Sequence, residues 1–182
     1  MTRTLHRSRV RYAVRAVRAV RAVAALSLTG ALLGGCTSET ESGAADRTSE
    51  VPDWDDKATP ATVSRQMNVD LPSKAADIRA ARQNGFQDDG LLLAFTVPTS
   101  GVNGFVERLR PERELRQRDE PRESVAKPMT PFSHLGLPEP ESLPEVREGQ
   151  VCAPCGGDLN SLAIAVHRLD DRRSRVYLRA VD

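Results

Sequence analysis

Short runs of apolar residues interrupt an otherwise polar chain and predict the strands of a sheet. Residues 91–97 read Leu-Leu-Leu-Ala-Phe-Thr-Val and lie between the turn residues Asp88-Asp89-Gly90 and Pro98. An apolar run of this length with turn residues on both sides is typical of a buried strand. Residues 76–82 are shorter and more mixed, and we expect them to form its antiparallel neighbour.

The C-terminus predicts a hairpin. Residues 162–166 and 176–181 are both apolar at alternate or successive positions, and a short polar segment at 169–173 connects them. Five arginines crowd this hairpin: Arg168, Arg172, Arg173, Arg175 and Arg179. We interpret them as a solvated sheet edge on which charge blocks edge-to-edge pairing. The alternative is a cationic face toward anionic lipid head groups or wall polymers.

One amphipathic helix is predicted between these strands. Val102, Phe105, Val106 and Leu109 have the spacing of a single apolar stripe on a helix. Thr99 or Ser100 is expected to cap the first turn, and Pro111 to end the helix.

This order of strand, strand, helix, long loop, strand and strand predicts an α+β fold for residues 69–182. We expect a small antiparallel sheet with one helix on one face, whose other face can remain in water. The long loop covers residues 112–148, which are rich in charge and proline. Its first part is expected to be a mobile insertion, whereas residues 129–137 are more apolar and should pack back on the domain.

Residues 36–68 predict a tether rather than part of the domain. The segment is acidic, contains few large apolar residues, and cannot bury enough surface to offset the entropy of ordering it. Trp54 within it is interpreted as unstructured, with a docking anchor as the alternative.

The N-terminus has the three parts of an export signal. Seven arginines and no acid occupy residues 1–21, an uncharged apolar stretch follows, and the small pair Gly34-Gly35 precedes Cys36. Leu33-Gly34-Gly35-Cys36 resembles the lipobox of bacterial lipoproteins. The resemblance implies that residues 1–35 are a signal peptide and that Cys36 receives a diacylglyceryl group and becomes the mature N-terminus.

This resemblance also implies a location, the outer face of the cytoplasmic membrane, with the lipid bilayer as a partner through Cys36. Two acyl chains anchor a protein stably. The 14 residues from 22 to 35 are fewer than the roughly 20 that a spanning helix needs. An ordinary secretory peptide with an incidental cysteine is the alternative.

Removal of the signal peptide changes the charge of the protein. Seven of the 26 basic residues lie in residues 1–35, which leaves 19 basic residues against 25 acidic ones and a net charge of −6. An acidic exported chain argues against nucleic acid as a partner, because nucleic-acid binding depends on a basic surface.

Cys152-Ala153-Pro154-Cys155 is the sharpest candidate for chemistry. It resembles the active pair of thioredoxin-like oxidoreductases, but those proteins place the pair at the start of a long helix, whereas Gly-Gly-Asp and a predicted strand follow here. Without lipidated Cys36, two cysteines remain outside the reducing cytoplasm, which favours a structural disulfide. Gly156 after the pair excludes c-type haem attachment.

Other candidate chemistry is weaker. Cys152, Cys155, His134 and His167 are the natural set for a structural zinc site, which needs four ligands, but no second tightly spaced pair exists and we expect no metal or cofactor. The acidic pairs Asp88-Asp89 and Asp170-Asp171 lie beside turn residues, where Asp caps its own backbone.

The sequence therefore favours a membrane-anchored, non-enzymatic binding or structural module whose ligand is unknown. The alternative is an extracytoplasmic thiol–disulfide oxidoreductase that uses Cys152 and Cys155. The segment that follows the cysteines distinguishes the two, since a helix favours redox chemistry and a loop favours structure. Gly85-Phe86-Gln87-Asp88-Asp89, the apolar strand, Pro98 and the short helix are similar to uncharacterised secreted lipoproteins of high-GC bacteria, a group that implies location but no activity.

Overall fold

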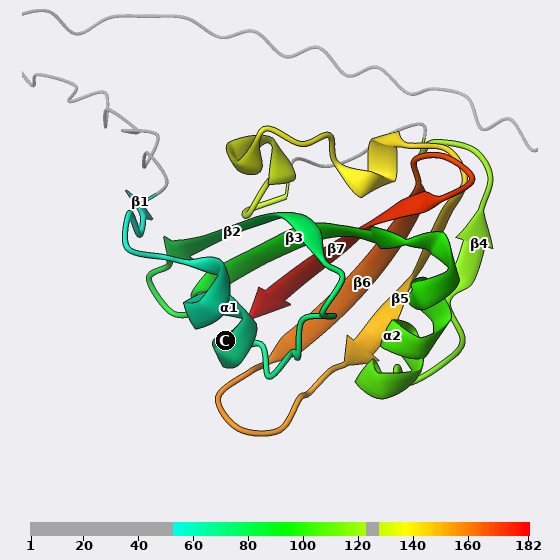
Figure 1. The fold of residues 1–182 in the computed structure, drawn as a ribbon. Helices are drawn as coiled ribbons and strands as arrows, with labels where there is room; N and C mark the ends of the chain where they lie inside the picture. Colours follow the sequence, from blue (N-terminus) through cyan, green and yellow to red (C-terminus); the bar gives the residue numbers. More distant parts are fainter. Residues whose placement is uncertain (1–52, 123–127) are drawn as a thin grey trace, which may run out of the picture. The chain divides into compact units, whose positions relative to one another are not determined.

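The computed structural model describes residues 53–122 and 128–182, which build an antiparallel seven-stranded sheet in the order β1-β2-β3-β7-β6-β5-β4 (Figure 1). The strands are β1 Asp53–Trp54, β2 Ala76–Asn84, β3 Gly90–Pro98, β4 Arg116–Arg118, β5 Val146–Cys152, β6 Ser161–Arg168 and β7 Arg173–Val181. The expected α+β class with an antiparallel sheet is thus confirmed.

The centre of the sheet follows the apolar pattern of the sequence. β3 pairs with β7 along its whole length, from Gly90 opposite Val181 to Pro98 opposite Arg173. β2 lies on the other side of β3, and β6 forms the expected hairpin with β7. Every residue of β3 from Gly90 to Val97 is buried, because both faces of the sheet are covered at this point.

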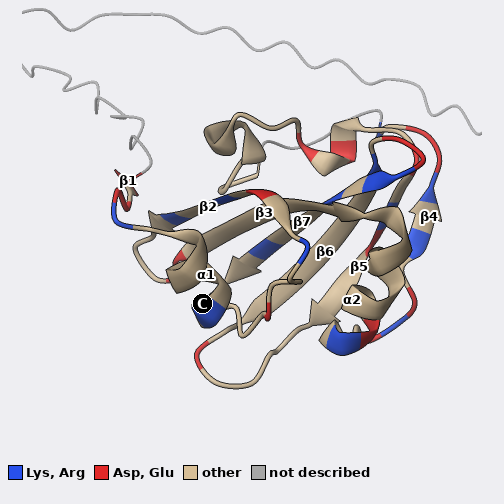
Figure 2. Ribbon diagram, viewed as in Figure 1, with Lys and Arg blue, Asp and Glu red and all other residues tan. Residues whose placement is uncertain are grey.

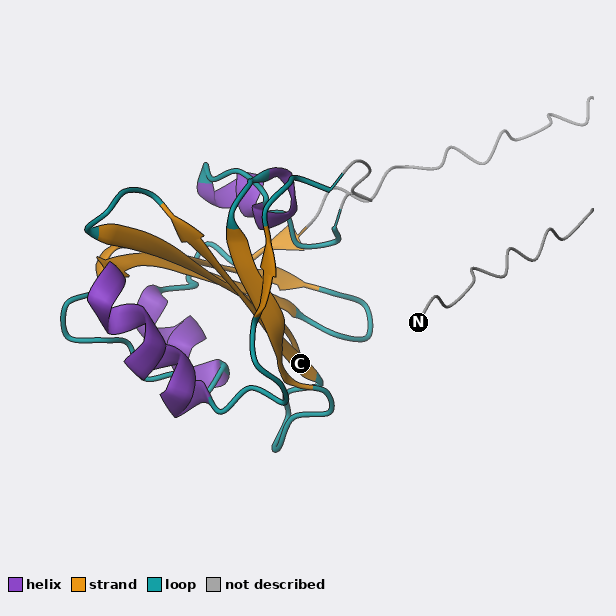
Figure 3. Ribbon diagram, turned by 90° about the vertical axis from the view of Figure 1, so that its right-hand side faces the viewer, coloured by secondary structure: helices purple, strands orange, loops and turns teal. Residues whose placement is uncertain are grey.

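Two helices cover one face, which we call the helix face (Figure 3). The expected helix is α2, Val102–Leu109, and its stripe buries Val102, Phe105 and Val106. Phe105 packs edge-on against Phe95 of β3, with ring centroids 5.3 Å apart. The cap differs from expectation: Thr99–Gly101 form a 3₁₀ turn, and the Thr99 hydroxyl bonds the Ser174 hydroxyl at 3.1 Å instead.

The second helix, α1 (Pro60–Gln66), corrects the expected end of the tether. Thr59 and Thr62 form reciprocal capping hydrogen bonds, and proline stands in the first turn, where it costs no hydrogen bond. Val63 is 0% exposed and Met67 1%, both in the core of the helix face. Residues 53–68 therefore belong to the domain, and residues 36–52 lie outside the described residues.

The opposite face carries the chain between β4 and β5, and we call it the loop face. Two 3₁₀ turns cover it, Phe132–Leu135 and Pro140–Ser142 (Figure 3). Phe132 packs edge-on against Tyr177 at 5.0 Å between ring centroids, so residues 129–137 do pack back as expected. Trp54, expected to be unstructured, stacks on His134 with ring centroids 3.7 Å apart.

The finer arrangement differs from the expected order in four elements. The structure adds β1, β4, β5 and α1, and two helices instead of one lie on the sheet. The expected long loop at 112–148 contains β4 and the start of β5, while its residues 123–127 lie outside the described part. Within the described residues, no helix has the length and apolar character needed to cross a bilayer.

Candidate functional site

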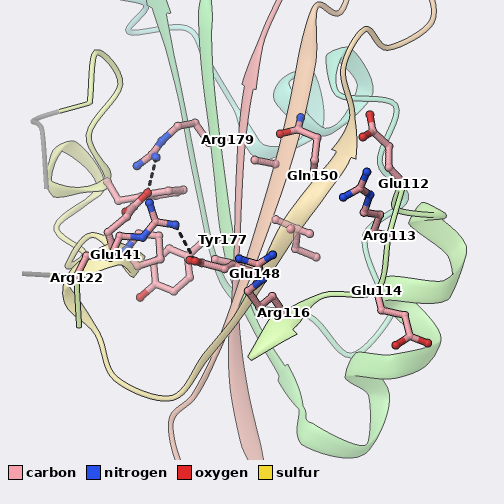
Figure 4. A pocket seen from close by; sticks show the side chains of 16 residues that line it. Glu112, Arg113, Glu114, Arg116, Arg122, Glu141, Glu148, Gln150, Tyr177 and Arg179 are labelled. Atoms are coloured by element: carbon pink, nitrogen blue, oxygen red, sulfur yellow. Dashed lines mark hydrogen bonds and ion pairs between the residues drawn. The ribbon is translucent and has the colours of Figure 1, made fainter. Parts of the chain in front are cut away.

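A pocket of about 370 Å³ lies on the loop face, over β5, β6 and β7 (Figure 4). Ala163 and Ala165 of β6 line it, and their small side chains leave space above the sheet. The alternate residues of β6, Leu162, Ile164 and Val166, belong to the core of the helix face. The two-residue period of the strand thus gives one packed face and one hollowed face.

Segment 112–122 forms one wall of this pocket because it runs close beside β5. Arg116 of β4 lies opposite Glu148 of β5 in the strand register. A side chain at Gly149 would place its Cβ 2.8 Å from the Leu115 Cδ2 atom, so glycine allows this approach without displacing the Leu115 side chain. Glu112 ties the segment to the next turn, since its carboxylate accepts from the Ala153 N–H at 2.7 Å.

An ion cluster fixes the lower wall of the pocket. Glu148 accepts hydrogen bonds from Arg122 at 2.7 Å and from Arg118 at 3.4 Å. Burial works to raise the pKa of Glu148, but the hydrogen bonds and charges of Arg122 and Arg118 outweigh it and hold that pKa below its ordinary value. Arg118 also donates to three backbone carbonyls, those of Glu120, Pro140 and Leu143, at 2.7–2.8 Å.

A second cluster lies next to the first, and both face the segment 112–114 across the pocket (Figure 4). Arg179 of β7 donates to Glu139 at 2.7 Å and to Glu141 at 3.0 Å, and its guanidinium lies over the Phe132 ring, 5.0 Å from the centroid. Arg179 Nε, Glu141 Oε2 and the Tyr177 hydroxyl are buried and have no hydrogen-bond partner among the described residues. Burial raises the pKa of Tyr177, although the nearby Arg175 charge works against this.

The pocket as a whole is balanced in charge. Four arginines and four glutamates line it: Arg113, Arg116, Arg122, Arg179, Glu112, Glu114, Glu141 and Glu148. Arg113 and Arg116 are exposed and form no ion pair within the described residues. The site therefore offers both free donors and paired carboxylates to an occupant.

The cysteine pair lies away from this pocket, at the far end of β5. Cys152 and Cys155 are placed as a disulfide with their Cα atoms 4.9 Å apart. The chain then runs through a loop to β6, which begins at Ser161, so the pair stands before a loop and a strand. Gln150 donates to the Cys152 and Leu162 carbonyls at 2.7 and 2.8 Å and holds this end of β5 in place.

The four candidate zinc ligands are not brought together. Cys152 pairs with Leu162 in the sheet and His167 with Val146, five residues further along β6, a separation of about 16 Å at the rise of a strand. His134 stacks on Trp54. The described residues contain no group of three or more His, Cys, Asp or Glu side chains suited to a metal ion.

The acidic pairs act in turns, as the sequence predicted. Asp89 accepts from the Gly85 N–H at 2.9 Å and pairs with Arg82, which lowers the pKa of the carboxyl. Asp170 accepts from the backbone N–H groups of Arg172 and Arg173 at 2.9 and 2.7 Å. These contacts give the carboxylates of Asp89 and Asp170 a structural role in their turns.

The interpretation of the C-terminal arginines as a solvated sheet edge is wrong for Arg175 and Arg179, whereas Arg168, Arg172 and Arg173 are exposed around the β6–β7 turn. β7 lies between β3 and β6, in the middle of the sheet. Arg175 pairs with Asp77 at 2.7 Å, and Arg179 with Glu139 and Glu141, so both guanidinium groups tie other segments to the loop face. Acids that are distant in sequence, rather than solvent, explain their positions.

Sequence reasoning missed most residues of the pocket. Arg116, Glu148 and Gln150 line it, but β4 is entirely polar, and the charge and proline around both strands indicated a loop. Cys36, the predicted lipidation site, lies outside the described residues. Comparison of the chain with protein-family models, with curated proteins and with solved structures gave no match.

Proposed function

We propose that this protein is a binding module on the outer face of the cytoplasmic membrane, anchored by lipid on Cys36, that holds a small polar ligand in the loop-face pocket. The observation that carries the proposal is the pocket itself, hollowed over Ala163 and Ala165 and walled by two ion clusters. Its volume of about 370 Å³ is within the range of small-molecule sites.

The lining indicates the class of ligand. Because the four arginines are matched by four glutamates, a zwitterionic or neutral polar molecule fits better than a polyanion. Exposed Arg113 and Arg116 can donate to an oxygen of the ligand, and Glu148 and Glu141 can accept from its N–H or O–H groups.

The contacts also support recognition over catalysis. The carboxylate Glu148 is held ionised by two arginines, and the side chains that line the described pocket include no Ser, Cys or His. The disulfide stands before a loop rather than at the start of a helix that would stabilise a thiolate. This arrangement supports a structural disulfide over an oxidoreductase.

Measurement of ligand binding to the loop-face pocket tests the proposal. We expect glycine, glutamine or glucose as probes to shift backbone amide NMR signals of β5–β7 in the exported chain, and inorganic phosphate to shift them less. Ala163→Leu should weaken this binding at least about tenfold, equivalent to ~1.4 kcal/mol. Ala61→Leu, on the exposed side of α1, is the matched control. Signals that move equally in both variants would contradict a site over β6.

A redox titration separates the two roles of the cysteines. A structural Cys152–Cys155 bond should have a reduction potential below about −300 mV against dithiothreitol. A potential near that of a strong oxidant, together with turnover of a reduced model substrate, would instead establish the oxidoreductase.

A further inference from the structure

A second hollow of about 660 Å³ lies on the other side of the sheet, between the C-terminal ends of α1 and α2 and the loop that connects β5 and β6. Figure 1 shows this loop in orange below the two helices. The hollow shares no lining residue with the loop-face pocket. It is therefore a separate candidate site, and its argument does not rest on the proposed ligand of that pocket.

The floor of the hollow is apolar. Four buried residues line it, Met67, Val151, Leu159 and Leu162, none more than 7% exposed, and the disulfide of Cys152 and Cys155 borders them. These residues belong to the core cluster of the helix face or pack against it. An apolar ligand segment placed here would extend that core and leave water, which is favourable in proportion to the area buried.

The rim of the hollow is cationic. Arg65 stands in the last turn of α1, Arg108 in the last turn of α2, and Arg110 caps α2. The ends of both helices carry the blue of Lys and Arg in Figure 2. A cation at a helix C-terminus offsets the helix dipole, but this effect acts on each helix alone. Here Arg65 and Arg110 line the same opening from two helix ends, together with Arg108, whose guanidinium also donates to the Gly104 carbonyl at 2.9 Å.

The arginines of the rim differ from most others in the fold. Eight arginines form ion pairs within the described residues, among them the clusters of the loop-face pocket, whereas Arg65, Arg108 and Arg110 form none. Asp158 is the one acid that lines the described hollow. In a chain with a net negative charge after export, this leaves a local excess of positive charge beside an apolar floor.

We propose that the hollow binds an amphiphilic anion, a carboxylate or phosphate head on a single apolar chain. The arginine rim takes the head through charge-assisted hydrogen bonds, which are among the strongest polar contacts in proteins. The floor around Met67 and Leu162 takes the chain. A hollow of this volume, with apolar residues in its floor and polar groups at its rim, is within the range of small-molecule sites.

Calorimetry with dodecanoate as the probe tests this proposal. The protein used comprises residues 36–182 with Cys36→Ser, so that no acyl chain of its own competes. We expect saturable one-to-one binding that Arg65→Gln with Arg110→Gln weakens at least about tenfold. The matched control, Arg168→Gln with Arg172→Gln, removes the same charge from the exposed β6–β7 turn and should leave binding unchanged. Circular dichroism checks that both proteins are folded.

Further probes define the ligand class. Acetate and inorganic phosphate should bind at least about tenfold more weakly than dodecanoate, because they lack the chain. Equal binding of phosphate, or equal binding by the rim variant and its control, would overturn the amphiphile site. Vesicles of phosphatidylglycerol and phosphatidylcholine provide the remaining comparison. If the protein adsorbs to these vesicles through the same arginines but does not bind dodecanoate, the hollow recognises a membrane surface and the single-chain ligand is ruled out.

Discussion

At the residue scale, Arg118 holds several segments of the loop face together, and no pattern in the sequence indicated this role. It is 14% exposed, pairs with Glu148, and donates to the carbonyls of Glu120, Pro140 and Leu143. One guanidinium thus ties the segment that follows β4 to the segment that precedes β5. Arg118 does not line the pocket itself, but it holds Glu148, which does.

Replacement of Arg118 by alanine should therefore destabilise the domain by about 2–4 kcal/mol, because Glu148 and three carbonyls lose a buried charged donor. Urea unfolding measures the free energy. Arg116→Ala, on the same strand but exposed and without an ion pair within the described residues, should change it by less than about 0.5 kcal/mol. Equal effects of the two substitutions would show that the contacts of Arg118 do not hold the wall.

His167 gives the stability of the domain a pH dependence. Burial, aided by the charge of Arg175 on β7, lowers the pKa of His167, while Glu145 opposes this. The unfolded chain therefore binds a proton at a higher pH than the folded one, and stability falls as the pH drops from about 6.5 through the folded pKa.

Removal of this imidazole should reduce the acid sensitivity. The unfolding free energies of the wild type and His167→Gln should run parallel above pH 7.5 and converge toward pH 5. Only the wild type loses stability through protonation of His167 in this range. A constant difference between the two proteins over this range would show that His167 does not titrate differently in the folded state. Urea unfolding at half-unit pH intervals resolves the two cases.

At the scale of elements, burial decided which parts could be predicted from the sequence. The interior strands β3, β6 and β7 and helix α2 were found because their apolar residues follow the period of a strand or a helix. β5 was missed because its loop-face positions carry Glu148 and Gln150, which line the pocket. The polar residues that line the pocket thus removed the apolar pattern by which β5 could have been recognised.

α1 was missed for a different reason. Seven mostly polar residues give too weak a pattern, and the helix forms through its cap at Thr59 and the burial of Val63 and Met67. The ion pairs of Arg175 and Arg179 join segments that are 98 and 40 residues apart, and no local pattern contains such partners. Tertiary contacts, rather than propensity, determine these features.

The packing of α1 predicts that Met67→Ala costs about 2–5 kcal/mol, since it leaves a cavity in the core of the helix face. Gln66→Ala on the exposed side of the same turn should change stability by less than about 0.5 kcal/mol. Chemical unfolding followed by the signal of the single tryptophan, Trp54, measures both. A chain that begins at residue 69, whose unfolding is followed by circular dichroism because it lacks Trp54, would contradict the place of α1 in the core if it were as stable as the full domain.

At the scale of the whole molecule, the two hollows lie on opposite faces of the sheet. The loop-face pocket is charge-balanced, and the hollow under the helix ends is cationic with an apolar floor. β5 and β6 separate them, and residues of both strands contribute to each side because successive side chains point to opposite faces. The domain in this way presents two chemically different hollows on opposite faces of one sheet.

The anchor itself provides the last prediction. Leu33-Gly34-Gly35-Cys36 follows a basic segment and an apolar stretch too short to span the bilayer, so attachment should depend on the Cys36 thiol. We expect mass spectrometry of the membrane fraction to find a diacylglyceryl group on Cys36, and Cys36→Ala to leave an unprocessed, unlipidated precursor. The paired substitutions Cys152→Ala and Cys155→Ala are the control and should retain both lipid and membrane attachment. A mature N-terminus at another residue, without lipid, would show that the chain is released rather than anchored.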